Sequence, residues 1–196
     1  MKKESLAVSH LLEHAFERHS ALVSGTSTIF GDIEKGAKLL VRVLRAHRKI
    51  LVCGNGGSAA DSQHFVAEWV CRYKNERSPL PAIALTTDTS VITAIGNDYS
   101  FEEIFSRQVR VLGVPGDVLV AFTTSGHSKN VLVAIHEAKV KKLKTIILTG
   151  MRGVSLRNSA DVTIVIPSDE TARIQEMHQL IYHAWCEYAD ACNVDK

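Results

Sequence analysis

The sequence has 196 residues, 45% of them hydrophobic, and a formal net charge of +2 at pH 7. This length and composition suit one domain with a full hydrophobic core, and the small net charge does not indicate a nucleic-acid partner. No stretch approaches the roughly 18 apolar residues of a membrane span, and the N-terminus lacks a secretory signal, so we expect a cytoplasmic protein without membrane contact.

The first part of the chain predicts two amphipathic helices, over residues 5–24 and 30–44, because apolar side chains recur among charged ones at helical spacing. Both helices precede the first predicted strand, so they cover either a face of the sheet or another subunit. We expect residues 1–196 to form a single domain. In it, residues 1–47 are a helical pair used in oligomer packing and residues 48–196 are the α/β core.

A strand, a tight turn and a helix are predicted next. The apolar run Ile50 to Cys53 stops at three glycines within four residues, and a helical segment follows. Glycines let the backbone approach a ligand, and free N–H groups in a first helical turn favour an anion or a sugar oxygen. His64, Glu68 and Arg72 follow at four-residue spacing, which places them on one helix face. A histidine and a glutamate four residues apart, such as His64 and Glu68, often form only a solvated ion pair. Here they follow a loop of the kind that binds ligands, and this position favours a functional site.

The same loop fits the dinucleotide-binding fingerprint G-x-G-x-x-A, at Gly54, Gly56 and Ala59. That fingerprint also expects an acidic residue roughly 20 positions further on, at the end of the second strand. Here Asn75 and Glu76 fall in a polar connector instead. The interpretation as a dinucleotide-dependent oxidoreductase is therefore weakened.

The remaining core alternates strands and helices. Further strands are predicted at 82–86, 118–122, 145–149 and 162–167, and helices at 87–95, 101–112, 151–160 and 171–191, with one more after 128. Gly96, Asn97 and Asp98 are expected to interrupt the helical stretch between 87 and 112. This alternation predicts the α/β class, with a doubly wound five-stranded parallel sheet and two N-terminal helices.

A hydroxyl-rich loop follows the third predicted strand, with the sequence Thr123-Thr124-Ser125-Gly126-His127-Ser128. Four hydroxyls and a glycine at a strand-to-helix junction favour a phosphate cradle, made of side-chain O–H donors and first-turn N–H groups. The alternative is an ordinary N-cap, but four hydroxyls exceed what one cap needs. Ligands of doubly wound sheets bind at the carboxyl ends of the strands, where this loop and loop 54–58 both lie.

The chain as a whole resembles the sugar isomerase (SIS) domain family, and most closely its branch that isomerises seven-carbon sugar phosphates. The resemblance covers essentially the whole length and implies a flavodoxin-like SIS fold. It depends on seven blocks in the same order: residues 54–61, 64–68, 80–90, 94–99, 105–109, 124–128 and 172–178.

The resemblance also implies the site. Substrate binding is expected at Asn55, Gly56, Gly57, Ser58, Glu68, Arg72, Asn97, Asp98, Thr123, Thr124, Ser125, Ser128 and Gln175, with the phosphate on Thr123, Thr124, Ser125 and Ser128. Glu68 corresponds to the base of the family, and His183 corresponds to its second acid/base group. A zinc site is expected at His64, Glu68, Gln175 and His183.

One geometric question stays open at this point. Gln175 and His183 lie about 12 Å apart along a regular helix. Either the helix is distorted, or the metal lies between the two side chains, or different subunits contribute them. His178, one turn after Gln175, is a competing ligand, and we interpret it as a packed histidine or as one that supports a metal ligand without touching the metal.

The activity implied by the resemblance is an aldose–ketose isomerisation. It converts D-sedoheptulose 7-phosphate to D-glycero-D-manno-heptose 7-phosphate through an enediolate, the first step of nucleotide-activated heptose synthesis. The resemblance also implies a homotetramer with sites near subunit interfaces. The alternative is a non-catalytic SIS-domain regulatory protein that binds the replication initiator. That branch lacks the counterparts of Glu68 and His183, so catalysis is favoured.

Overall fold

The computed structural model describes residues 2–194, and the side chains of residues 8–194. Five strands form one parallel sheet in the order β2-β1-β3-β4-β5, which confirms the predicted doubly wound α/β fold. All five predicted strands are present, with ends that differ by at most two residues. They are β1 (Ile50–Cys53), β2 (Ala82–Ala84), β3 (Val118–Thr123), β4 (Lys144–Gly150) and β5 (Val162–Ile166).

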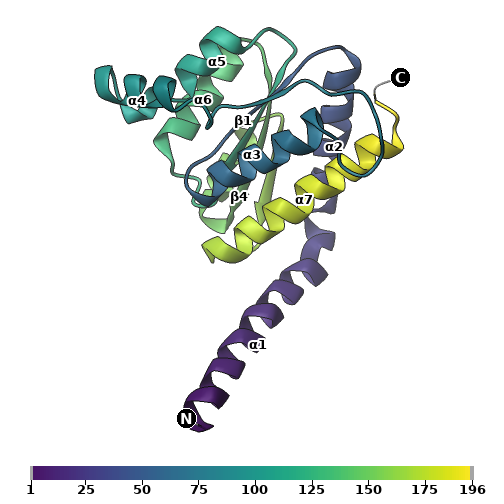
Figure 1. The fold of residues 1–196 in the computed structure, drawn as a ribbon, viewed down its shortest axis with the longest axis vertical. Helices are drawn as coiled ribbons and strands as arrows, with labels where there is room; N and C mark the ends of the chain where they lie inside the picture. Colours follow the sequence, from purple (N-terminus) through teal and green to yellow (C-terminus); the bar gives the residue numbers. More distant parts are fainter. Residues whose placement is uncertain (1, 195–196) are drawn as a thin grey trace.

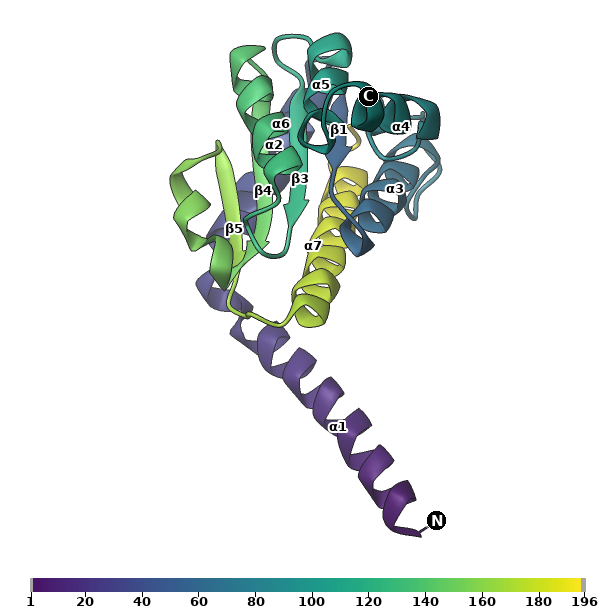
Figure 2. The same ribbon diagram turned by 90° about the vertical axis from the view of Figure 1, so that its left-hand side faces the viewer.

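Helices cover both faces of the sheet (Figures 1 and 2). The seven α-helices among the described residues are α1 (Lys2–Ser24), α2 (Phe30–Arg45), α3 (Gly57–Val70), α4 (Thr89–Asp98), α5 (Ser106–Leu112), α6 (Lys129–Val140) and α7 (Thr171–Ala191). Short 3-10 helices are η1 (Gly25–Thr28), η2 (Phe101–Glu103) and η3 (Met151–Asn158). Side chains of α2, α3 and α7 share one hydrophobic core with one face of the sheet, and those of α4, α5 and α6 form a second core on the other.

Two expected helix boundaries are wrong. Gly96 does not interrupt α4, because a single exposed glycine costs a helix only about 1 kcal/mol and Asp88 caps the helix by accepting the N–H of Val91 at 2.9 Å. The expected helix over residues 101–112 divides into η2 and α5. There the buried Ser106 hydroxyl donates to the carbonyl of Glu103 at 3.2 Å, which competes with the helical hydrogen bonds.

The two N-terminal helices have different surroundings. Helix α2 buries Leu40 and Leu44 in the core of its own chain, so it packs against the α/β body. The expected role of the two helices in oligomer packing stays a prediction. Helix α1 extends away from that body in both views (Figures 1 and 2). It leaves apolar side chains exposed, among them Val8, Leu11, Leu12 and Phe16.

A buried ion pair joins the end of α3 to α7. The side chains of Arg77 and Asp190 are 6% and 4% exposed, and Arg77 Nε donates to Asp190 Oδ1 at 3.1 Å. The same guanidinium donates to the carbonyls of Glu68 (2.6 Å) and Trp69 (2.9 Å) in the last turn of α3. A cation at these carbonyls also complements the helix dipole. This contact fixes α3 and α7 side by side.

This ion pair predicts a pH dependence of stability. Burial raises the pKa of Asp190, but hydrogen bonds from the backbone N–H groups of Asn75 and Lys74 and from Arg77 outweigh it, so the pKa lies below the ordinary 3.8. A lowered folded-state pKa stabilises the fold above the unfolded value, and this contribution disappears as the pH falls through the folded value.

The variant that tests this dependence is Asp190→Asn. We expect it to be less stable than the wild type at pH 7, and the difference in unfolding free energy to shrink at pH values below 3.8. Urea unfolding at a series of pH values measures both proteins under the same conditions. A difference that is independent of pH would contradict the assignment.

Within residues 2–194, no helix combines the length and the apolar composition that crossing a bilayer requires.

Candidate functional site

The glycine loop after β1 has a backbone that few residues can adopt. Gly56 has φ +55° and ψ −121°, in the region that favours glycine. A Cβ at Gly54 would lie 2.7 Å from the carbonyl oxygen of Ser58, so the turn closes tightly. A Cβ at Gly57 would lie 2.5 Å from the side-chain nitrogen of Gln175. The glycines therefore let α7 approach the first turn of α3.

The hydroxyl loop after β3 is ordered by its own side chains. Thr123 Oγ1 accepts the N–H of Gly126 (3.2 Å) and lies 3.4 Å from Ser128 Oγ, while Ser125 Oγ accepts the N–H of His127 (3.2 Å). Ser128 occupies the N-cap position of α6, yet its side chain makes no capping hydrogen bond. A simple N-cap role therefore does not account for these hydroxyls.

The two loops meet at the switch point of the sheet. Strands β1 and β3 are neighbours, with Cys53 opposite Ala121, and each loop leaves the carboxyl end of its strand. From there the chain continues into α3 on one face and into α6 on the other. Doubly wound folds bind their ligands in the crevice at this point.

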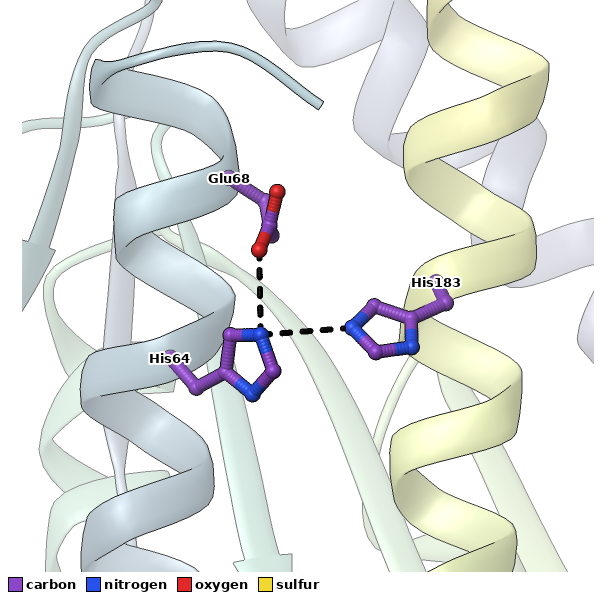
Figure 3. Close-up of side chains that lie close together, drawn as sticks. All are labelled: His64, Glu68 and His183. Carbon is purple, nitrogen blue, oxygen red and sulfur yellow. Dashed lines mark hydrogen bonds and ion pairs between the residues drawn. The ribbon is translucent and has the colours of Figure 1, made fainter. Parts of the chain in front are cut away.

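A second group of polar side chains lies between α3 and α7 (Figure 3). His64 Nε2 is 3.0 Å from Glu68 Oε1 and 3.4 Å from His183 Nε2. The pair on α3 follows from the four-residue spacing, and His183 reaches it from α7, more than 100 positions later in the sequence. The structure thus brings together the expected base and the expected second acid/base group.

Aromatic neighbours hold the two histidines. The Tyr182 hydroxyl shares a hydrogen bond of 3.0 Å with His64 Nδ1, and the ring of Tyr73 stacks on His183 at 5.7 Å. Burial, and then the electrostatic effect of the neighbouring His64, lower the pKa of His183, although Glu68 opposes the effect. His183 is therefore neutral at pH 7 and can accept a proton.

The three donors can hold a metal ion. One ligand atom each from His64, Glu68 and His183 lies within 4.8 Å of the others. Ligands of a tetrahedral zinc stand about 3.3 Å from one another, close to the spacing seen here, and two imidazoles with a carboxylate are a common catalytic zinc set. Tyr182 hydrogen-bonds Nδ1 of His64, so Nε2 of His64 stays free to face Glu68 and His183. Metal-binding histidines commonly have such a hydrogen-bond partner on their second ring nitrogen.

Gln175, the fourth expected metal ligand, lies beside Gly57 and not with the other three. Helix α7 is continuous from Thr171 to Ala191, so about 12 Å along the axis separates Gln175 from His183. Its position suits contact with a ligand of the glycine loop. Its role as a metal ligand stays a prediction.

Arg72 does not share the helix face of His64 and Glu68, and that expectation is wrong. Helix α3 ends at Val70, and the Arg72 guanidinium pairs with Glu76 at 3.5 Å and donates to the carbonyl of Lys74 at 3.3 Å. The helix ends there because Arg77 occupies its last carbonyls. A substrate contact by Arg72 stays a prediction.

Asn97 and Asp98 are exposed at the end of α4, where Asn97 Nδ2 donates to Asp98 Oδ1 at 2.8 Å. Helix α4 packs in the core on the other face of the sheet from α3 and α7. Within one chain the structure therefore does not bring these two residues to the His64 group. Their expected role in substrate binding stays a prediction.

Sequence reasoning missed several residues near the site. Tyr182 precedes His183 and carries no spacing signal of its own. Asp61 lies one turn before His64, and burial raises its pKa to about 6. Its Oδ2 is buried without a hydrogen-bond partner among the described residues. His178 is confirmed as a packed histidine, fully buried against Phe122.

Comparison with known proteins agrees with this fold. The profile of the SIS domain matches residues 16–150. Phosphoheptose isomerase 1 of Campylobacter jejuni is 50% identical over 181 residues, which cover 92% of this chain and 97% of that protein. The structure of a phosphoheptose isomerase from Neisseria gonorrhoeae superposes with a TM-score of 0.88 at 42% identity, over 94% of this chain and 99% of that one. The structure of a phosphoheptose isomerase from Francisella tularensis superposes with a TM-score of 0.89 at 41% identity, over 93% of this chain and 97% of that one.

The doubly wound sheet, its two switch-point loops and the profile match define a SIS-domain protein. The chain shares about half of its residues with the Campylobacter jejuni protein over nearly its full length, and two proteins can share a fold with far lower sequence identity. The chain belongs to the phosphoheptose isomerase family of SIS-domain proteins.

Proposed function

We propose that this protein converts D-sedoheptulose 7-phosphate to D-glycero-D-manno-heptose 7-phosphate, the first step of nucleotide-activated heptose synthesis. One observation carries the proposal: Glu68 and His183 both lie within hydrogen-bond distance of His64, although they come from different helices. An aldose–ketose isomerisation needs such a pair, one group for the carbon-bound proton and one for the oxygen-bound proton.

Each side chain has one task in this reaction. Glu68 takes a proton from C1 of the ketose. The electron pair of the broken C1–H bond becomes the second bond of C1=C2 in an enediolate, and the carbonyl pair moves onto O2. The same carboxyl group then returns the proton to C2. His183, neutral because of its lowered pKa, moves the hydroxyl proton from O1 to O2, which leaves C1 as the aldehyde. Two well-placed acid/base groups of this kind contribute about 10²–10⁴-fold each.

The spacing of the site suits a seven-carbon phosphate. Gly57 and His64 are seven residues apart in α3, about 10 Å along the axis. An extended heptose phosphate also spans on the order of 10 Å, given carbon–carbon bonds of about 1.5 Å. A sugar whose phosphate end lies near the first turn of α3 would therefore reach the level of His64, where Glu68 and His183 meet.

Zinc is the metal that this donor set favours, held by His64, Glu68 and His183. A bound zinc ion supplies Lewis acidity, which stabilises negative charge on a substrate oxygen. To act as the base, Glu68 needs a carboxylate oxygen that is free to accept a proton from the substrate. We therefore propose that its contact with the metal is weak.

We also propose a homotetramer. Helix α1 extends from the body with Leu11, Leu12 and Phe16 exposed, and an apolar stripe of this kind suits packing against other copies of the chain. Such packing would let a neighbouring subunit supply Asn97 and Asp98 to the site. A cytoplasmic location stays a prediction.

The phosphate contact predicts the behaviour of Ser125→Ala. We expect KM for sedoheptulose 7-phosphate to rise roughly 10- to 100-fold with little change in kcat, because a hydrogen bond to a charged group contributes about 1.5–3 kcal/mol in both the ground state and the transition state. Steady-state kinetics measure both constants. Ser155→Ala, an exposed serine of η3, is the control. An unchanged KM for Ser125→Ala would place the phosphate elsewhere.

The direct test of the function is to incubate the purified protein with sedoheptulose 7-phosphate and to follow the aldose C1 proton by NMR. Formation of the aldose supports the proposal. Binding of the ketose without any aldose would contradict it and would favour a binding protein.

A further inference from the structure

A partly buried side-chain amide, Asn55, pairs with a buried one, Asn130, across the crevice between the two loops. Asn55 Nδ2 donates to Asn130 Oδ1 at 2.8 Å, and Asn130 Nδ2 donates back to Asn55 Oδ1 at 2.8 Å. Asn130 is 3% exposed and is the second residue of α6. Its Oδ1 also accepts the N–H of Val131 at 3.0 Å, which fixes the orientation of the amide.

The Asn55–Asn130 pair joins two different loops of the site. Asn55 belongs to the glycine loop after β1, and Asn130 follows the hydroxyl loop after β3. Each loop is otherwise held mainly by its own contacts: Ser58 N–H to Asn55 O in the first, and Gly126 N–H to Thr123 in the second. The amide pair is therefore a direct tie between the two sides of the switch-point crevice.

The pair also decides what Asn55 can offer a substrate. An asparagine amide has two N–H donors and one oxygen. Asn130 engages the oxygen and one N–H of Asn55, so one N–H stays available, and its direction is fixed by Asn130. Because Asn130 is buried, water does not compete for these hydrogen bonds, and they are stronger than exposed ones.

We infer that Asn130 is a positioning residue of the isomerase: through Asn55 it fixes the glycine loop relative to the hydroxyl loop. It thereby sets where the reacting sugar carbons stand when the phosphate is anchored. This inference rests on the proposed function. It assigns Asn130 no contact with the substrate.

The inference predicts that Asn130→Ala separates turnover from phosphate binding. The hydroxyl loop keeps its internal hydrogen bonds, so we expect the Kd for inorganic phosphate to stay within about threefold of wild type. The kcat for sedoheptulose 7-phosphate should fall about 10²-fold, the typical effect of misplacing reacting groups by 1 Å. Isothermal calorimetry and steady-state kinetics give the two numbers.

Two further variants separate positioning from folding. Asn130→Ser is smaller but polar, cannot reach Asn55, and should show the same split if Asn130→Ala does not fold. Thr163→Val, whose hydroxyl donates to the carbonyl of Leu156 at 3.1 Å in the edge strand β5, loses a comparable interior hydrogen bond away from the site. Its Tm should fall without a change in kcat.

A double variant tests whether Asn130 acts through Asn55. If it does, Asn55→Ala combined with Asn130→Ala has the same kcat as Asn55→Ala alone, because contacting residues are not additive. Losses that multiply would overturn the inference, as would a wild-type kcat in Asn130→Ala or Asn130→Ser. Loss of phosphate binding together with kcat would show that Asn130 only builds the hydroxyl loop. A wild-type protein that does not isomerise the ketose would refute the proposed function itself, and the inference with it.

Discussion

Glu68→Gln is expected to lower kcat for sedoheptulose 7-phosphate by about 10²–10⁴-fold, the usual contribution of one acid/base group. The amide has the shape of the carboxylate and its oxygen can still accept a hydrogen bond from His64, so the helix pair stays intact. It cannot carry a proton between C1 and C2. Because the change removes a group that acts only in the transition state, KM should change much less than kcat.

The measurement is steady-state kinetics, with thermal unfolding to show that the variant is folded. Glu34→Gln is the matched control, because Glu34 makes the same type of i,i+4 ion pair, with Lys38, on the surface of α2. Its kcat should equal that of the wild type. If Glu68→Gln turned over within about threefold of wild type, Glu68 would not be the base.

His183→Gln is the second change with a large expected effect. Glutamine can donate and accept hydrogen bonds, but it cannot move a proton between O1 and O2, so kcat should again fall about 10²–10⁴-fold. The side chain is partly exposed and stacks on Tyr73, and a stable fold is expected without it.

The His183 variant also has a readout that is independent of turnover. If His183 is a metal ligand, zinc bound to the purified protein, measured by mass spectrometry of the metal, should decrease in His183→Gln. His136→Gln, an exposed histidine of α6, should keep both kcat and zinc content. Wild-type kcat in His183→Gln would remove this residue from the chemistry.

The sequence predicted those parts of the fold that have a local cause. The strand Ile50–Cys53 is a continuous apolar run that ends at glycines, and α7 begins and ends where its helical periodicity does. His64 and Glu68 could be paired from their spacing alone. The hydroxyl loop could also be recognised locally, because four hydroxyls stand together at one strand end.

Contacts between distant segments had no local signal. His183 joined the site through a family resemblance, since its periodicity says nothing about a partner more than 100 residues earlier. Arg72 was misplaced because the end of α3 is set by Arg77, which no helix-end rule of the sequence identified. Asn130 was missed for the same reason: its partner Asn55 lies 75 residues away on another loop.

The measurement that tests the account most directly is a crystal structure of Glu68→Gln soaked with sedoheptulose 7-phosphate, in which slow turnover preserves the ketose. We predict the phosphate among the hydroxyls of Thr123, Thr124, Ser125 and Ser128, with C1 and C2 within hydrogen-bond reach of His183 and of the side chain changed by Glu68→Gln. A ketose whose C1 and C2 lie far from both side chains would contradict the account.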